Sequence, residues 1–92
     1  MREIINFLES KNINDVYLTP AGNISVFQDN KYMIWVDTND SVLQKSDKIA
    51  FYNVEVKSFD SPYMELSSKA KCKTQNDVID FLNKTLDNFK LL

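Results

Sequence analysis

The chain has 92 residues, of which 43% are hydrophobic and 26% charged, and its formal net charge is −2. This length suits one domain with a single hydrophobic core, and the composition is that of an ordinary soluble globular protein. The mild negative charge argues against a general phosphate-neutralising role, because nucleic-acid binders usually carry a clear basic excess.

Histidine is absent from the sequence, which removes the commonest general base near neutral pH and the commonest metal ligand. A single cysteine, Cys72, cannot form an internal disulfide, which favours a reducing compartment. No signal-peptide core is visible at the N-terminus, and no apolar run approaches the roughly 20 residues of a spanning helix. We therefore expect a cytoplasmic protein that is not an enzyme and holds no cofactor or metal.

The first elements are a short helix and a short strand. Arg2–Lys11 places Ile4 and Leu8 on one face at helical spacing, which predicts an amphipathic helix. Asp15–Thr19 alternates apolar and polar residues and is typical of a strand. Residues 20–23, Pro-Ala-Gly-Asn, then predict a turn, because Pro presets φ and Gly accepts the left-handed conformation.

The segment Ile24–Val36 has the pattern of a β-hairpin with a two-residue turn at Asp29-Asn30. That turn would place Phe27 opposite Tyr32. Side chains alternate across a sheet, so each strand has two faces. The expected core face is Ile24, Val26, Met33 and Trp35, and the opposite face is Phe27, Tyr32, Ile34 and Val36.

A polar segment, Asp37–Asp47, follows and predicts a loop. Lys48–Lys57 predicts the next strand. Its expected core face is Ala50, Tyr52, Val54 and Val56, and its opposite face carries Ile49 and Phe51.

The C-terminal third contains a strand and the clearest helix. Tyr63–Lys73 alternates cleanly and predicts a strand. Thr74 followed by Asp77 is typical of a helix N-cap, and Gln75–Lys90 repeats apolar residues at helical spacing. The resulting order, α-β-β-β-β-β-α, predicts a single α+β domain over residues 1–92, with an open antiparallel sheet of about five strands and both helices packed on it.

An apolar surface on the second face of the sheet is the first candidate site. If the helices cover the expected core face, the other face exposes Phe27, Tyr32, Ile34 and Phe51, and large apolar patches mark partner surfaces. Three alternatives remain at this point: a helix crosses to that face, the loop at 37–47 folds over it, or the register is shifted by one residue.

A row of lysines is the second candidate site. Lys69, Lys71 and Lys73 recur at every second position, about 7 Å apart along a strand, which could follow a nucleic-acid backbone. Lysines on an edge strand also prevent sheet-to-sheet aggregation, and this interpretation needs no ligand.

Two further patterns favour structural interpretations. Asp37, Asn39 and Ser41 resemble the start of a calcium loop, but the sixth position is Val42 in place of Gly, and the twelfth is Lys48 in place of Glu. A solvated loop is therefore expected there. Cys72 continues the apolar row of its strand, which indicates a small buried residue rather than a reactive thiol.

The function expected from the sequence is that of a small, non-catalytic binding module. It would bind a protein partner, or a second copy of itself, through Phe27, Tyr32, Ile34 and Phe51. Binding of a nucleic acid through the lysine row is the alternative, and no membrane association is expected. The abundance of Asn and Lys beside a single Arg is typical of AT-rich coding sequence. An inhibitor or accessory protein of a phage or another mobile element fits that bias.

Overall fold

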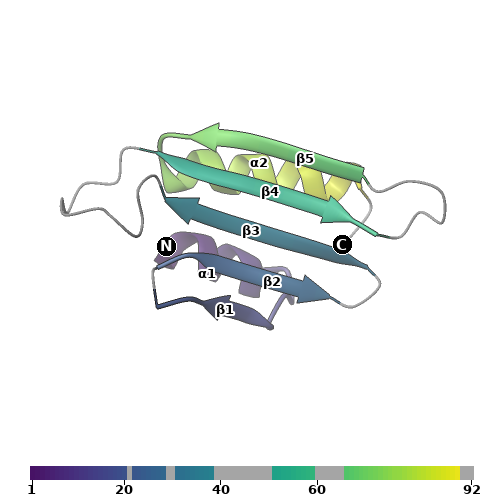
Figure 1. The fold of residues 1–92 in the computed structure, drawn as a ribbon, viewed down its shortest axis with the longest axis horizontal. Helices are drawn as coiled ribbons and strands as arrows, with labels where there is room; N and C mark the ends of the chain where they lie inside the picture. The colour runs from purple at the N-terminus through teal and green to yellow at the C-terminus, as the bar shows by residue number, and fades with distance from the viewer. Residues whose placement is uncertain (21, 29–30, 39–50, 60–65, 90–92) are drawn as a thin grey trace.

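The computed structural model describes residues 1–20, 22–28, 31–38, 51–59 and 66–89, and these form a five-stranded antiparallel sheet with two helices on one face (Figure 1). The elements are α1 (Arg2–Ser10), β1 (Val16–Leu18), β2 (Ile24–Gln28), β3 (Tyr32–Thr38), β4 (Tyr52–Ser58), β5 (Leu66–Cys72) and α2 (Gln75–Asn88). The strands lie side by side in their sequence order. The predicted α+β fold is confirmed.

The strands are amphipathic, and this determines which side of the sheet the helices cover. From Tyr52 to Ser58, every second side chain of β4 is buried and the intervening ones are partly exposed. The central strand β3 repeats this pattern from Tyr32 to Val36. A sheet with this period buries one face against the core and leaves the other toward solvent, as antiparallel sheets commonly do.

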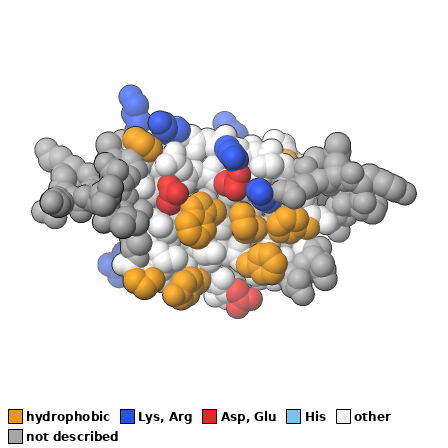
Figure 2. Space-filling view, in the orientation of Figure 1, with side chains coloured by type: hydrophobic (Ala, Val, Ile, Leu, Met, Phe, Trp, Pro, Cys, Tyr) orange, Lys and Arg blue, Asp and Glu red, His pale blue; other side chains and the backbone are white. Residues whose placement is uncertain are grey.

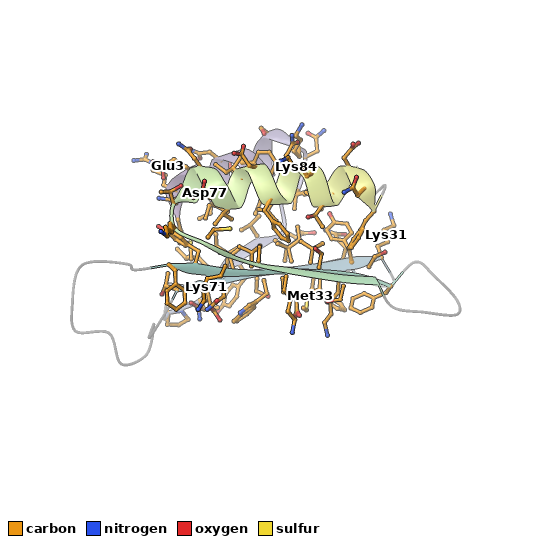
Figure 3. All side chains as sticks on the ribbon, turned by 90° about the horizontal axis from the view of Figure 1, so that it is seen from above. Glu3, Lys31, Met33, Lys71, Asp77 and Lys84 are labelled. Atoms are coloured by element: carbon orange, nitrogen blue, oxygen red, sulfur yellow. The ribbon has the colours of Figure 1, made fainter. Side chains whose placement is uncertain are left out.

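Both helices lie on the buried side of the sheet, as the view from above shows (Figure 3). Ile4 and Leu8 of α1 and Leu82 of α2 are fully buried. Each such side chain contributes roughly 1.5–3 kcal/mol through removal of apolar surface from water. The helices also contact each other, and α2 packs on β4 and β5.

The start of α2 is capped as predicted. Thr74 precedes the helix in an extended conformation, and its hydroxyl oxygen accepts a hydrogen bond from the backbone N–H of Asp77 at 3.1 Å. This bond satisfies one of the backbone donors that a helix N-terminus leaves free, a contribution of about 1 kcal/mol. The side chain of Gln75 also accepts a bond from the backbone N–H of Glu3 at 3.2 Å, which joins the starts of the two helices.

Several predicted element ends differ from the structure. The first helix ends at Ser10, one residue earlier than expected, and Asn12 then takes a left-handed φ of 63°. The fourth strand begins at Tyr52, so Phe51, which was predicted to belong to it, lies just before it, and the fifth ends at Cys72, one residue earlier than expected. The predicted starts of these two strands at Lys48 and Tyr63 lie outside the described residues.

Other predictions lie partly or wholly outside the described residues. These are the turn at Asp29-Asn30, the loop and calcium-like pattern from residue 39 onward, the faces of Ile49 and Ala50, and the end of the last helix at Lys90.

The register of the β2–β3 hairpin differs from the prediction by one residue. Gln28 pairs with Tyr32 and Val26 pairs with Ile34, so three residues connect the strands instead of two. The backbone N–H of Lys31 donates a hydrogen bond to the carbonyl of Gln28 at 3.0 Å. Three-residue hairpin loops are the next most common after two-residue ones, and Asp-Asn alone does not distinguish the two.

The shift in register exchanges the faces of all β3 side chains, because the side-chain period of a strand is two. Tyr32, Ile34 and Val36 were predicted to lie opposite the core, and the structure buries all three within it. Met33 was predicted to be core and instead points away from the helices (Figure 3). Trp35, also predicted to be core, shares the face of Met33 by strand alternation and is only partly buried. The assignments of Ile24 and Val26 to the core are confirmed.

This register predicts a large difference between two neighbouring apolar positions. Ile34 is 0% exposed and Phe27 is 59% exposed. We expect Ile34→Ala to lower the free energy of unfolding by about 2–5 kcal/mol, because it leaves a cavity in the core. Phe27→Ala is expected to lower it by about 1 kcal/mol or less. Urea unfolding followed by circular dichroism measures both, and equal losses would contradict the register.

Candidate functional site

The candidate site is the side of the sheet that faces away from both helices, which we call the open face (Figure 2). Hydrophobic side chains gather over its middle and extend toward the β1 edge, and charged side chains lie among and beside them on the β5 side. By strand alternation, its residues within the described strands are Tyr17, Ser25, Phe27, Met33, Trp35, Asp37, Asn53, Glu55, Lys57, Ser67, Lys69 and Lys71.

Two of the four predicted partner-binding residues lie on the open face, and two do not. Phe27 projects from β2 on this face, and Phe51, just before β4, lies beneath the ammonium group of Lys71. Tyr32 and Ile34 are 7% and 0% exposed and belong to the core, so they are not available as surface residues. The three-residue connection between β2 and β3 is the cause.

Aromatic and sulfur-containing side chains form the apolar part of the open face. Phe27 pairs across the strands with Met33, and its ring lies 6.4 Å from the ring of Phe59 in a tilted arrangement. Tyr17, on the short edge strand β1, is 61% exposed. These positions provide rigid apolar area, which carries much of the binding energy of protein interfaces.

Trp35 occupies the middle of the open face and is held by hydrogen bonds. Its indole N–H donates to one carboxylate oxygen of Asp37 at 3.1 Å, and the side-chain amide of Asn53 donates to the other oxygen at 2.9 Å. Asp37 and Asn53 face each other across β3 and β4. The carboxylate thus accepts from both neighbours, and the indole ring is fixed in one orientation without losing its exposed surface.

The lysines of β5 are engaged with neighbours on the same face. The ammonium group of Lys69 lies 3.2 Å from a carboxylate oxygen of Glu55. The ammonium group of Lys71 lies 4.1 Å from the centre of the Phe51 ring, a cation–π contact. Lys73 follows the end of β5 and is exposed. The structure therefore places Lys69 and Lys71 together on one face and surrounds them with an acid and an aromatic ring.

An open hollow of about 490 Å³ lies between Trp35 and these charged side chains. Its floor is the backbone around Val54 and Ala70, because their side chains point toward the helices. Its walls are Trp35, Asp37, Asn53, Glu55, Lys69 and Lys71. A shallow hollow lined by one aromatic ring and both charge signs can receive a side chain of a docked partner.

Two observations on the described residues concern metal binding and nucleophilic chemistry. These residues contain no group of three or more Cys, Asp or Glu side chains placed to hold a metal ion. Cys72 is buried as predicted, and burial, together with the nearby charge of Asp77, raises the pKa of its thiol. A thiol with a raised pKa is a poor nucleophile at neutral pH. The lysines beside it in sequence therefore do not activate it.

The sequence interpretation missed Met33, Trp35 and Phe59 as surface residues. Met33 and Trp35 were placed in the core by the shifted register, and Phe59 lies just after β4, where no strand was predicted. A signal for the correct register does exist in the sequence. Pairing Val26 with Ile34 joins the β-branched residues of both strands with Val54 and Val56 in one apolar face.

Comparisons of this chain with protein-family models, with curated proteins and with solved structures find no match. Among the described residues, neither helix combines the length and apolar character needed to cross a membrane. The case for a function therefore depends on the residues of the open face.

The Trp35–Asp37 bond can be tested directly, because Trp35 is the single tryptophan of the chain. We expect Asp37→Ala to shift its fluorescence to longer wavelength and to speed quenching by acrylamide, because the indole loses its fixed orientation. The free energy of unfolding should fall by about 1 kcal/mol. Asp80→Ala, on the exposed side of α2, is the matched control and should change neither signal. Unchanged quenching in Asp37→Ala would contradict the role of this bond.

Proposed function

We propose that the protein is a small, non-catalytic binding module that recognises a protein partner through the open face. The observation that carries this proposal is the pair of strongly exposed aromatic side chains, Tyr17 and Phe27, beside Met33 and Trp35 on the face that neither described helix covers. Large exposed apolar side chains gathered on one face mark interaction sites in soluble proteins.

The arrangement of polar groups supports a protein as the partner. Protein interfaces commonly have an apolar centre with a polar rim. Phe27, Met33 and Trp35 supply the centre, and the ion pair of Glu55 with Lys69 lies beside it. The side chain of Glu55 is 21% exposed, so its neighbours cover most of it. The side chain of Lys69 is 75% exposed and extends into solvent. An inhibitor or accessory protein of a mobile element could use this face to cover a surface of its target.

Binding of a nucleic acid is the second candidate, and the position of Lys69 and Lys71 beside Trp35 favours it. Single-stranded nucleic acids bind to aromatic platforms bordered by basic side chains. On this face, however, Asp37 and Glu55 lie among the lysines and would repel phosphate groups. The mixed charge therefore favours a protein.

Site-specific photo-crosslinking tests the protein-binding proposal. A benzophenone side chain in place of Phe27 should form a covalent adduct with a partner protein in extracts of the source cells. The same group in place of Lys84, on the exposed side of α2, is the matched control and should form none. The adduct should weaken when excess unmodified protein competes. Absence of adducts, or equal adducts from both positions, would contradict the proposal.

The nucleic-acid alternative has its own measurement. We expect the protein not to bind single-stranded DNA or RNA oligonucleotides at physiological ionic strength in a fluorescence anisotropy titration, because Asp37 and Glu55 lie beside the lysine row on neighbouring strands. Salt-dependent binding that disappears in a Lys69→Glu, Lys71→Glu, Lys73→Glu triple variant would instead establish the alternative.

A further inference from the structure

We propose that the partner protein inserts an arginine side chain into the hollow of the open face, where the guanidinium group stacks on Trp35 and donates hydrogen bonds to Asp37. This inference rests on the proposed function and names the side chain by which the partner is recognised. It follows from the charge that Asp37 keeps, from the indole ring beside it, and from the size of the hollow.

The carboxylate of Asp37 is hydrogen-bonded but not neutralised. Its two oxygens accept one bond each, from the indole N–H of Trp35 and the side-chain amide of Asn53, and both donors are uncharged. Within the part of the chain that the structure describes, no Lys or Arg forms an ion pair with this group. A carboxylate has about four lone-pair sites, so each oxygen can accept a second bond. Asp37 therefore offers a negative charge and further acceptor positions at the wall of the hollow.

The indole ring of Trp35 adds a second attraction for a cation. The face of an aromatic ring carries the negative part of its quadrupole, and tryptophan binds cations best. Because the indole N–H is bonded to Asp37, the ring lies directly beside the carboxylate. A guanidinium group can use both, since it is planar, stacks on aromatic faces and carries five N–H donors. A lysine ammonium group is compact and strongly hydrated and cannot stack, so arginine is the better fit.

The other charges of the hollow do not favour an acidic side chain in this position. Glu55 and Lys69 form an ion pair at 3.2 Å, so their charges offset each other. The ammonium group of Lys71 lies 4.1 Å from the centre of the ring of Phe51, which precedes β4. An acid that entered the hollow would meet the negative face of the indole and the carboxylate beside it, which repel an anion.

The size of the hollow suits one side chain. Its volume of about 490 Å³ lies within the range of roughly 300–1,000 Å³ that is typical of ligand sites. The backbone around Val54 and Ala70 forms the floor, on which the aliphatic part of an arginine side chain can rest. Since the hollow is open, the side chain enters it directly from a docked surface.

Titration with a capped amino acid tests this inference. The probe is Nα-acetyl-arginine N-methylamide, and the signal is the indole N–H resonance of Trp35, the single tryptophan of the chain. We expect a saturable shift with a dissociation constant on the order of millimolar, because one side chain makes few contacts. The citrulline analogue has a similar shape without the charge and should bind about tenfold more weakly. The lysine analogue should also bind more weakly, and the glutamate analogue should cause no shift.

A charge-neutral variant supplies a second measurement. Asp37→Asn removes the negative charge and keeps a side-chain oxygen that can accept the indole N–H bond. We expect it to weaken binding of the arginine probe by about tenfold or more. Asp80→Asn, on the exposed side of α2, makes the same change of net charge elsewhere and should leave binding unchanged. Unchanged binding in Asp37→Asn, or equal losses in both variants, overturns the proposed site.

The outcomes separate this inference from the proposed function. If the arginine probe causes no indole shift up to its solubility limit, or if the citrulline or glutamate analogue binds as well, the arginine site is overturned. The protein-binding proposal is judged independently by the adducts formed at position 27. Adducts without arginine binding leave that proposal intact and reject the arginine site. Arginine binding without adducts contradicts the proposed function and overturns a protein as the source of the guanidinium group.

Discussion

The pairing of Val26 with Ile34 determines which side chains of the central strand β3 are buried and which face solvent. Because successive residues of a strand point to opposite faces, this one pairing assigns every β3 side chain to the same face as, or the face opposite to, the buried Ile24 and Val26 of β2. The helices then add a single constraint, that the face carrying Ile34 is buried. Because Met33 and Trp35 alternate with the buried residues of β3, they lie on the opposite, open face.

The open face holds the large aromatic ring of Trp35 among polar groups that bond to it and to each other. Trp35 is tied to Asp37, and Asp37 to Asn53, so the surface carries a rigid apolar ring with satisfied polar neighbours. A rigid side chain loses less conformational entropy on binding than a mobile one. The same hydrogen bonds also explain how a tryptophan can remain partly exposed without disturbing the strand beneath it.

Much of the fold follows from the sequence, and the candidate site follows only in part. The helix start at Thr74 and the apolar faces of α2 and β4 depend on local spacing, so they could be predicted. The faces of Tyr32 and Ile34 depend on one residue more or less in a hairpin loop, and Asp-Asn suits either length. The bond from Trp35 to Asp37 depends on that same register, so it could not be foreseen once the register was shifted.

The distribution of charge decides what kind of surface this face is. A patch for phosphate would concentrate lysines, whereas here Glu55 lies against Lys69, and Lys71 covers Phe51. Charges of both signs beside the apolar side chains of Phe27, Met33 and Trp35 suit a protein surface that also carries apolar groups and both charge signs. Because Asp37 and Glu55 lie beside these lysines, a nucleic acid would meet repulsion as well as attraction on this face, and this is the physical reason that the proposed partner is a protein.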